Sequence, residues 1–284
     1  MRKHSTKRSA TAGAWGFLCA CAIGVSAALA AEPTPQRLGP EQVAQLRTFL
    51  KTGMTQLGIP GVAFALVDDG KVVAAEGLGV TDLRNPSPVT DRTLFMIGSN
   101  TKSMTTLLQA KLVDEGKVAW TTPVSKIYPE FRLGDSATTA KVEFRHLACM
   151  CTGIPSGDLE WILGMDRKTD PAATFQMLAS TQPTAKFGKV AQYNNVIVAA
   201  AGFIAGHLVY PELPLVQAYR RAMQEKVFGP LGMMSTTFDL ERVLARHHAM
   251  PHGLDREGRP APGLYIGDYP AMSPAGSAWS DARD

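Results

Sequence analysis

Apolar side chains recur at helical spacing close to the start of the region that reads as folded: Val43, Leu46, Leu50, Met54 and Leu57. Residues three or four positions apart lie on one face of an α-helix, so this spacing predicts a single amphipathic helix. The sequence Gly58-Ile59-Pro60 follows, and glycine favours a left-handed helix end whereas proline cannot continue a helix. We therefore expect this helix to end near Gly58.

Two apolar-rich runs come next, over residues 61–67 and 71–80, and Asp68-Asp69-Gly70 separates them. An Asp-Gly pair between two such runs is a strong signal for a β-hairpin, because tight hairpin turns need residues that tolerate positive φ. The predicted order is helix, strand, strand. This order favours an antiparallel sheet and argues against a β-α-β start.

Helical patterns dominate from about residue 100 to 250. Met104, Leu107, Leu108 and Leu112 predict the buried stripe of one helix, which Gly116 closes. Further helices are expected over about 171–181, 193–208 and 213–228. After His252 the chain becomes rich in glycine and proline again, as expected for a return to sheet structure. The chain therefore has a mixed α/β pattern.

The first thirty residues read as a targeting segment rather than part of the fold. Arg2, Lys3, Lys7 and Arg8 precede an uncharged apolar or small stretch over 14–30, which ends in Ala28-Leu29-Ala30. This pattern predicts a signal peptide over 1–30 and a periplasmic or secreted mature protein. An uncleaved anchor is the alternative, although the stretch is shorter than the ~20 residues of a comfortable span, and no later segment resembles one.

Removal of this segment would change the charge balance. Four of the 29 basic residues lie in residues 1–30, whereas none of the 25 acidic residues do, so residues 31–284 carry 25 of each. A balanced chain offers no basic surface for nucleic acid. Its length suits one large domain, or a core with an inserted subdomain.

The only S-x-x-K in the chain is Ser99-Asn100-Thr101-Lys102, directly before the helical stripe that begins at Met104. Ser99 is therefore expected at a helix N-terminus, where free N–H groups favour developing negative charge. Lys102 lies one turn further on the same face. A serine hydroxyl needs an adjacent base to become a nucleophile, and Lys102 can be that base. The alternative is a capping serine beside a solvated lysine.

A second candidate element is Tyr193-Asn194-Asn195. A tyrosine hydroxyl can relay a proton between a serine and a leaving group, and an asparagine two residues later can bind a substrate carbonyl or hold the lysine. These roles would fall to Tyr193 and Asn195. The alternative is a helix entry in which asparagine serves as a cap.

The segment from Phe95 to Ser103, FMIGSNTKS, resembles the active-site segment of the serine β-lactamase and penicillin-binding-protein superfamily. Tyr193-x-Asn195 resembles the second motif of that family. PLGM at 230–233, with Thr236 and Phe238, and PAGSAWS at 274–280 resemble two further segments. The resemblance is greatest to the branch of class C β-lactamases, D-alanyl-D-alanine carboxypeptidases and esterases, and it extends over about residues 40–284.

This resemblance implies an α/β (α+β) fold in which helices flank an antiparallel sheet and a helical subdomain is inserted at about 106–250. It implies that Ser99 is acylated, that Lys102 and Tyr193 share proton transfer, that Asn195 contacts the substrate, and that no cofactor or metal is needed. The expected substrate is a β-lactam, a D-Ala-D-Ala peptidoglycan peptide or a small ester. A penicillin-binding sensor or scaffold, or a truncated pseudoenzyme without turnover, is the alternative function. The oligomeric state stays open.

The sequence departs from the family pattern at three places. Cys149-Met150-Cys151-Thr152-Gly153 stands where relatives tend to carry Thr-Ser-Gly, and Ser277 stands where many have a second glycine. The third family motif, a Lys- or His-containing segment that ends in glycine on a strand and supplies an oxyanion donor, is absent. Residues 280–284 read as a helix N-cap followed by an acidic first turn. These features predict a chain truncated before its last strands and a final helix.

Two other clusters suggest weaker alternatives. Cys149 and Cys151 could pair or, with His146, bind a metal, but a C-x-C loop is tight and no fourth ligand presents itself, so we expect two small buried hydrophobic residues. Cys19 and Cys21 would leave with the signal peptide. His247, His248 and His252 form a loose group that Pro251 interrupts, which favours a solvated loop over a metal site. No G-x-S-x-G nucleophile elbow occurs.

Overall fold

The computed structural model describes residues 37–284 except 160–163, 165, 167 and 264–268. The predicted signal peptide, 1–30, lies outside the described residues. Residues 38–284 belong to one structural unit, and the following description concerns this unit alone.

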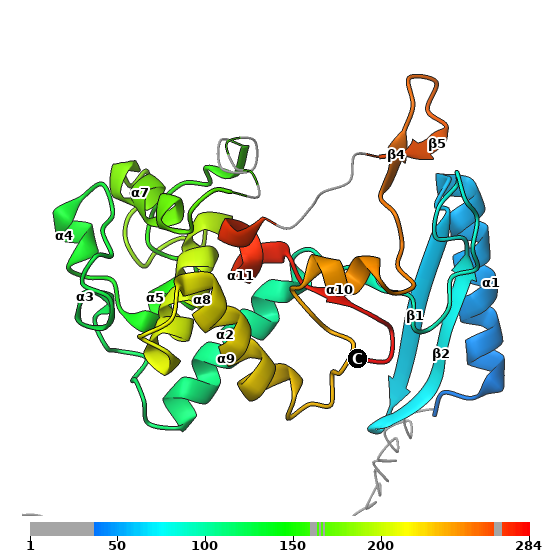
Figure 1. The fold of residues 1–284 in the computed structure, drawn as a ribbon, viewed down its shortest axis with the longest axis horizontal. Coiled ribbons are helices and arrows are strands. Elements are labelled where there is room, and N and C mark those ends of the chain that lie inside the picture. The colour runs from blue at the N-terminus through cyan, green and yellow to red at the C-terminus, as the bar shows by residue number, and fades with distance from the viewer. Residues whose placement is uncertain (1–36, 160–163, 165, 167, 264–268) are drawn as a thin grey trace, which may run out of the picture. The chain divides into compact units, whose positions relative to one another are not determined.

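The helix and hairpin predicted at the start of the folded region are confirmed. Helix α1 spans Pro40–Leu57 and ends at Gly58, whose φ of +64° gives the left-handed cap. Strands β1 (Gly61–Asp68) and β2 (Lys71–Gly79) pair antiparallel across a turn in which Asp69 and Gly70 both have positive φ, as a tight hairpin requires. Helix α1 lies along this hairpin (Figure 1).

An ion pair attaches α1 to the hairpin. The Arg47 guanidinium donates two hydrogen bonds to the Glu76 carboxylate of β2, at 2.9 and 2.7 Å. This two-point geometry orients the helix on the strand, although such a partly exposed pair adds only modest stability.

The described strands form three antiparallel pairs rather than one continuous sheet. Besides β1–β2, strand β3 (Phe95–Met96) pairs with β6 (Trp279–Ser280), and β4 (His252–Leu254) pairs with β5 (Pro260–Pro262). The antiparallel arrangement and the return to strand structure after His252 agree with the sequence prediction. The β3–β6 pair joins Phe95 to Ser280, which lie far apart in the chain, and β3 lies shortly before α2.

Helices are the main regular elements described between β3 and β4. They comprise α2 (Asn100–Asp114), α3 (Val124–Ile127), α4 (Ser136–Thr139), α5 (Phe144–Ala148), α7 (Ala172–Ser180), α8 (Asn195–Val209), α9 (Leu215–Met223), the π-helical turn η1 (Gln224–Phe228) and α10 (Leu240–Leu244). The 3₁₀ turn η2 (Pro270–Met272) and α11 (Ser273–Gly276) follow β5. The four helices expected from periodicity are all present.

Helix α8 is the centre of the core. Every residue from Val196 to Gly206 is buried, and α2, α5, α7, α9 and α11 pack around the helix (Figure 1). A helix that is apolar on all sides removes its side chains from water only when other elements cover every face of it. Its position matters for function because α2 and the segment just before α8 carry the candidate site residues.

One detail of the sequence prediction is wrong. Leu107, expected in the buried stripe of α2, is 40% exposed, and the buried face of that helix instead includes the polar residues Thr101, Lys102, Thr105 and Gln109. Residues 281–284, in the segment that reads as a helix N-cap and first turn, belong to no helix or strand in the described chain, and the interpretation as a helix start stays a prediction.

At that end of the described chain, Ser280 belongs to strand β6 and the Asp284 carboxylate turns back to the loop before α10. It accepts hydrogen bonds from the Ser235 and Thr236 backbone N–H groups, both at 2.7 Å. The Asp284 side chain therefore binds a distant loop, whereas Asp281 makes a local cap-like contact: its Oδ1 accepts from the Arg283 and Asp284 backbone N–H groups at 2.9 and 3.1 Å.

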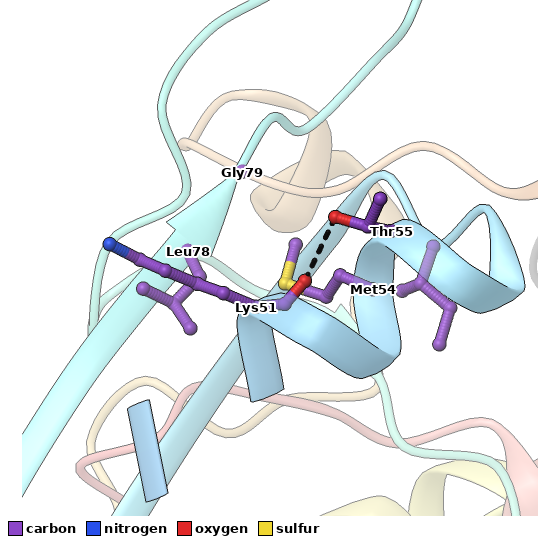
Figure 2. Close-up of a pocket in the computed structure, with 6 residues that line it drawn as sticks. Lys51, Met54, Thr55, Leu78 and Gly79 are labelled. Atoms are coloured by element: carbon purple, nitrogen blue, oxygen red, sulfur yellow. Dashed lines mark hydrogen bonds between the residues drawn. The ribbon is translucent and has the colours of Figure 1, made fainter. Parts of the chain in front are cut away.

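Among the described residues, no helix has both the length and the apolar character that a membrane span requires. A surface pocket of about 380 Å³ lies between α1 and β2, where Lys51, Met54, Thr55, Leu78 and Gly79 line it (Figure 2). The Thr55 hydroxyl donates to the Lys51 carbonyl at 3.0 Å. This pocket contains a single charged side chain and none of the predicted site residues.

Candidate active site

Ser99 lies where strand β3 turns into helix α2. Ile97 continues the pairing beyond β3, since its N–H donates to the Ala278 carbonyl at 2.9 Å. Gly98 then adopts φ +55°, a left-handed conformation that glycine accepts at little cost, and Ser99 is the N-cap of α2. The strand, the glycine turn and the helix start together present the Ser99 side chain at a helix N-terminus, as the sequence predicts.

Lys102 reaches back to Ser99 from the first turn of α2. Its Nζ lies 2.9 Å from the Ser99 Oγ and donates to the Ala275 carbonyl of α11 at 2.6 Å. The side chain is 8% exposed, which excludes the alternative of a solvated lysine. The ammonium is therefore held between the serine and one backbone carbonyl, away from bulk water.

Tyr193 comes from the irregular segment before α8, and its hydroxyl lies 2.6 Å from the Ser99 Oγ. The Lys102 Nζ lies 4.7 Å from the centroid of the Tyr193 ring, a cation–π distance. Ser99 thus has a phenol on one side and an ammonium on the other, from separate parts of the chain. The Tyr193 side chain is 51% exposed, so the group opens to solvent on the tyrosine side.

The surroundings of Tyr193 act on its acidity in opposite directions. Burial disfavours the phenolate and raises the pKa, but the hydrogen bonds with Lys102 and Ser99 and the lysine charge favour the phenolate, and the nearby Asp158 carboxylate opposes it. The outcome is a Tyr193 pKa below the ordinary value of a tyrosine. A lowered pKa increases the fraction of phenolate, which is the form of Tyr193 that can accept a proton.

The two asparagines after Tyr193 have different positions. Asn194 is buried and is the N-cap of α8: its Oδ1 accepts from the Ile197 N–H at 2.9 Å, and its Nδ2 donates to the Pro155 carbonyl at 2.8 Å. The capping alternative therefore applies to Asn194. Asn195 is partly exposed, and its backbone N–H donates to Asp158 Oδ1 at 3.3 Å. Its predicted role in substrate contact stays a prediction.

A buried polar chain supports the carbonyl that holds Lys102, and the sequence reasoning missed it. The Thr105 hydroxyl lies 2.8 Å from the Tyr219 hydroxyl and 2.8 Å from the Pro274 carbonyl, next to Ala275. Thr105 and Tyr219 are fully buried, and burial raises the pKa of Tyr219 well above its ordinary value. The signal that could have revealed Thr105 is its position three residues after Lys102 on the same helical face.

Comparisons with known proteins bear on this arrangement. The Beta-lactamase family model matches residues 46–284, which is most of the chain. The chain belongs to the Beta-lactamase family. Its mixed α/β fold, with helices and small antiparallel sheets, agrees with that of solved members.

Two solved structures are similar to this family member. The octameric penicillin-binding protein homologue from Pyrococcus abyssi has a TM-score of 0.71 and 28% sequence identity, over 85% of this chain and 54% of the other. The D-alanine carboxypeptidase AmpC from Burkholderia cenocepacia has a TM-score of 0.65 and 23% identity, over 85% of this chain and 62% of the other. The second likeness shows the fold alone.

Curated relatives have a similar degree of sequence identity. Unguisins hydrolase ungD' of Aspergillus campestris (strain IBT 28561) is 29% identical over 248 residues, which cover 83% of this chain and 44% of the relative. Protein flp of Staphylococcus aureus (strain MW2) is 24% identical over 218 residues, 77% of this chain and 43% of the relative. The chain therefore spans less than half the length of these two relatives.

One departure from the family pattern fits the backbone without difficulty. Ser277, which stands where many relatives have glycine, has φ −99°, a conformation open to any residue. Its side chain is buried, and its Oγ has no hydrogen-bond partner within the described part of the chain. The substitution therefore introduces a buried hydroxyl beside α11 without backbone strain.

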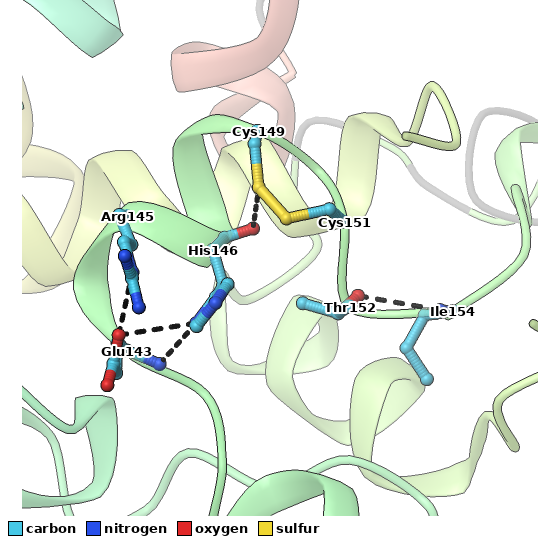
Figure 3. Close-up of a disulfide and its surroundings, with 7 residues drawn as sticks. All are labelled: Glu143, Arg145, His146, Cys149, Cys151, Thr152 and Ile154. Carbon is cyan, nitrogen blue, oxygen red and sulfur yellow. Dashed lines mark hydrogen bonds and ion pairs between the residues drawn. A yellow bond between two sulfur atoms is a disulfide. The ribbon is translucent and has the colours of Figure 1, made fainter. Parts of the chain in front are cut away.

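The expectation for the cysteines is wrong. Cys149 and Cys151 form a disulfide, and Cys149 is exposed while Cys151 is partly exposed, so they are not two small buried hydrophobic residues (Figure 3). The nearby His146 accepts a hydrogen bond on Nδ1 from the Glu143 N–H at 2.9 Å, and burial lowers its pKa. Because the C-x-C spacing allows the sulfur atoms to meet only across a sharp turn, the sequence alone favoured the wrong alternative.

The three histidines of the later loop each have their own partner. His247 lies between the Thr93 and Ser87 hydroxyls at 3.1 and 3.2 Å, whereas His252 Nε2 accepts from the Leu83 N–H at 3.1 Å. The residues that the structure describes contain no group of three or more potential metal ligands. These histidines connect the loop to the segment before β3.

Proposed function

We propose that this chain is the catalytic part of a serine hydrolase that cleaves an amide or ester through an acyl-Ser99 intermediate. The observation that carries the proposal is the convergence on one hydroxyl: Ser99 Oγ lies 2.6 Å from the Tyr193 hydroxyl and 2.9 Å from the Lys102 Nζ. A serine flanked by two groups that can exchange protons is the arrangement that nucleophilic catalysis requires.

In the proposed reaction, Ser99 Oγ attacks the carbonyl carbon while its proton passes to the Tyr193 phenolate, which the Lys102 ammonium stabilises. Tyr193 then gives the proton to the leaving amine or alcohol as the bond to the carbonyl carbon breaks. Water hydrolyses the acyl-serine by the reverse use of the same groups, which releases the acid and restores the Ser99 hydroxyl. The proton transfers use only the named side chains, the substrate and water.

The helix start assists this chemistry. The Ser99 N–H is at the N-terminus of α2, and no hydrogen bond from it is found within the described residues. A free N–H at that place can donate to the oxygen of the tetrahedral intermediate, where the helix dipole also favours negative charge. Asn195, partly exposed on the first turn of α8, is the proposed contact for the substrate carbonyl.

The proposed substrates are a β-lactam, a D-Ala-D-Ala peptidoglycan peptide or a small ester. The relatives support this range: one is a hydrolase, one a penicillin-binding protein homologue and one a D-alanine carboxypeptidase. Export to the periplasm or the medium, as the 1–30 segment predicts, would place the chain where peptidoglycan peptides and β-lactams occur.

The test compares turnover of nitrocefin with that of p-nitrophenyl butyrate by the protein and by Ser99→Ala. Faster nitrocefin turnover supports a lactamase, and faster ester turnover supports an esterase. Loss of the nucleophile should lower either rate by more than about 1000-fold. Activity that survives Ser99→Ala would overturn the proposal. A stable β-lactam adduct on Ser99 without product release would instead support the penicillin-binding alternative.

A further inference from the structure

The segment that presents Tyr193 contacts one residue on both sides of the tyrosine. The Gln192 N–H donates to the Met150 carbonyl at 3.1 Å, and the Asn194 N–H donates to the Met150 Sδ at 3.4 Å. Tyr193 itself lies between these two anchoring points. The position of Met150 therefore determines where the Tyr193 hydroxyl lies relative to Ser99.

Further bonds join the same two segments. The Gly188 N–H donates to the Cys151 carbonyl at 2.8 Å, and the Asn194 side chain donates to the Pro155 carbonyl at 2.8 Å. Residues 189–194 belong to no helix or strand. Because such a segment has no hydrogen-bond ladder of its own, the turn at 149–155 supplies much of what holds it.

Met150 has a backbone conformation that needs support. Its φ is +50°, and a side chain with a Cβ adopts this left-handed region only at a cost of roughly 1–2 kcal/mol. The disulfide between Cys149 and Cys151 closes directly across this residue, with a Cα–Cα distance of 5.2 Å (Figure 3). The covalent bridge restricts the turn to conformations that keep its two ends close.

We propose that the Cys149–Cys151 disulfide is a positioning element for Tyr193 and makes turnover sensitive to thiol reductants; this inference rests on the proposed function. The bridge holds Met150 at positive φ, and Met150 holds Gln192 and Asn194, so that the Tyr193 hydroxyl meets Ser99 Oγ at 2.6 Å. Cys149 is exposed, which gives a reductant access to the sulfur atoms.

The redox step is a thiol–disulfide exchange with a dithiol. One thiolate of the dithiol attacks a cysteine sulfur, the S–S bond breaks, and the second thiolate resolves the mixed disulfide. The protein gains two electrons and two protons as two cysteine thiols, and the dithiol becomes a cyclic disulfide. Met150 is then free to leave the left-handed region, and the Tyr193 segment loses its fixed anchor.

The experiment uses the folded oxidised protein, its dithiol-reduced form and Cys149→Ala/Cys151→Ala, each assayed on the substrate that the oxidised protein turns over. Intact mass and thiol titration establish the redox state. We expect reduction and the double substitution each to lower kcat by about 10- to 100-fold, because a misplacement of about 1 Å has that effect. KM should change little, and the dithiol should not affect the double variant.

Two further readouts separate positioning from general stability. The pH profile of kcat should move to higher pH after reduction, because the bonds to Lys102 and Ser99 that lower the Tyr193 pKa weaken. Met150→Asn lacks the Sδ contact with Asn194 in both redox states, so the quantity to compare is the ratio of reduced to oxidised kcat. This ratio should lie closer to one in Met150→Asn than in the unsubstituted chain, since asparagine adopts the left-handed conformation more readily than methionine. Reduction of already folded protein makes the test independent of refolding.

The possible failures are distinguishable. An oxidised protein that turns over substrate with the same kcat and pH profile after reduction, and in the double variant, would overturn the positioning role alone. The positioning role would also be overturned if kcat falls after reduction while the pH profile stays unchanged and Met150→Asn does not lessen the fall. An oxidised protein that neither turns over substrate nor becomes labelled at Ser99 would instead overturn the proposed function.

Discussion

The Tyr193 hydroxyl and the Ser99 Oγ lie 2.6 Å apart, although 94 positions separate the two residues in the chain. Ser99 is fixed by a strand, a glycine turn and a helix, whereas Tyr193 comes from an irregular segment that leads into α8. The serine therefore has a rigid base, and its phenolic partner depends on contacts with other loops. This difference decides which substitutions should affect chemistry without affecting the fold.

Tyr193→Phe removes only the hydroxyl and keeps the ring over Lys102. We expect kcat to fall by about 100- to 10,000-fold, the usual contribution of a positioned acid–base group. KM and the melting temperature should change little, because the Tyr193 side chain is 51% exposed. Steady-state kinetics and a thermal melt on the same preparation check both parts.

Tyr210→Phe is the matched control for that substitution. Tyr210 donates a hydrogen bond to the exposed Glu225 carboxylate and has no contact with Ser99 or Lys102. Its loss should leave kcat within about twofold of the unsubstituted chain, the range of surface substitutions. Equal rates for Tyr193→Phe and Tyr210→Phe would exclude a role for the Tyr193 hydroxyl in the reaction.

The pH dependence should follow the lowered Tyr193 pKa. Burial opposes ionisation, but the hydrogen bonds with Lys102 and Ser99 outweigh it, so the phenolate that accepts a proton forms at lower pH than in an ordinary tyrosine. The ultraviolet titration of the protein minus that of Tyr193→Phe isolates this group. We expect its midpoint below the ordinary tyrosine value, with kcat rising through the same range.

Two substitutions should move this midpoint in opposite directions. Lys102→Met removes the hydrogen bond and the positive charge that favour the phenolate, so the Tyr193 pKa should rise. Asp158→Asn removes a negative charge that opposes the phenolate, so the pKa should fall. A midpoint that stays constant in both variants would contradict the electrostatic account of this site.

The order of elements was predictable from the sequence because its signals are local. The hydrophobic spacing before Gly58 and the Asp69-Gly70 turn specify α1 and the β1–β2 hairpin without reference to distant residues. The S-x-x-K spacing likewise placed Lys102 beside Ser99, since residues three apart share a helical face. Tertiary context changes neither result.

Two of the features that sequence reasoning missed depend on distant partners. Thr105 is buried because Tyr219 and the Pro274 carbonyl, 114 and 169 positions away, provide its hydrogen bonds. Asp284 belongs to a segment that reads as a helix start, yet its carboxylate accepts hydrogen bonds from the backbone N–H groups of Ser235 and Thr236. Propensity and periodicity describe a segment alone and cannot identify such partners.

The buried hydroxyl chain leads to a prediction about stability. Thr105→Val leaves the Tyr219 hydroxyl and the Pro274 carbonyl buried without that partner, at a cost of about 1–3 kcal/mol in the free energy of unfolding. Tyr219→Phe should cost less, about 1 kcal/mol, because the Thr105 hydroxyl keeps the Pro274 and Thr101 carbonyls as acceptors. Urea unfolding of both variants measures this difference.

Thr105→Val and Tyr219→Phe also test what holds the Ala275 carbonyl in place to accept from Lys102. Thr105→Val should also lower kcat, because the Pro274 carbonyl adjoins the Ala275 carbonyl that accepts from the Lys102 Nζ. Tyr219→Phe should leave kcat closer to that of the unsubstituted chain. If Tyr219→Phe proves the more destabilising and the less active variant, Thr105 is not the residue that holds this carbonyl.

Two glycines of α8 allow its neighbours to approach, and only the neighbour at Gly202 directly adjoins the Ala275 carbonyl that accepts from Lys102. A Cβ at Gly202 would lie 2.3 Å from the Pro274 Cβ, whereas a Cβ at Gly206 would lie 2.5 Å from the Tyr219 backbone nitrogen. Neither contact is tolerable, so Gly202→Ala and Gly206→Ala should each destabilise the protein by about 1–3 kcal/mol through overpacking. Alanine's better helix propensity offsets about 1 kcal/mol of this.

The two variants should differ in activity measured at a temperature where both are folded. Gly202→Ala displaces Pro274 and with it the Ala275 carbonyl, which lies only 2.6 Å from the Lys102 Nζ, so kcat should fall by about tenfold or more. Gly206→Ala instead displaces the Tyr219 backbone in α9. Its kcat should fall less than that of Gly202→Ala, although the two variants lose similar stability. If Gly202→Ala retains full activity while Gly206→Ala loses activity, α11 does not position the lysine. The contact between Lys102 and the Ala275 carbonyl would then be a consequence of packing rather than a support for catalysis.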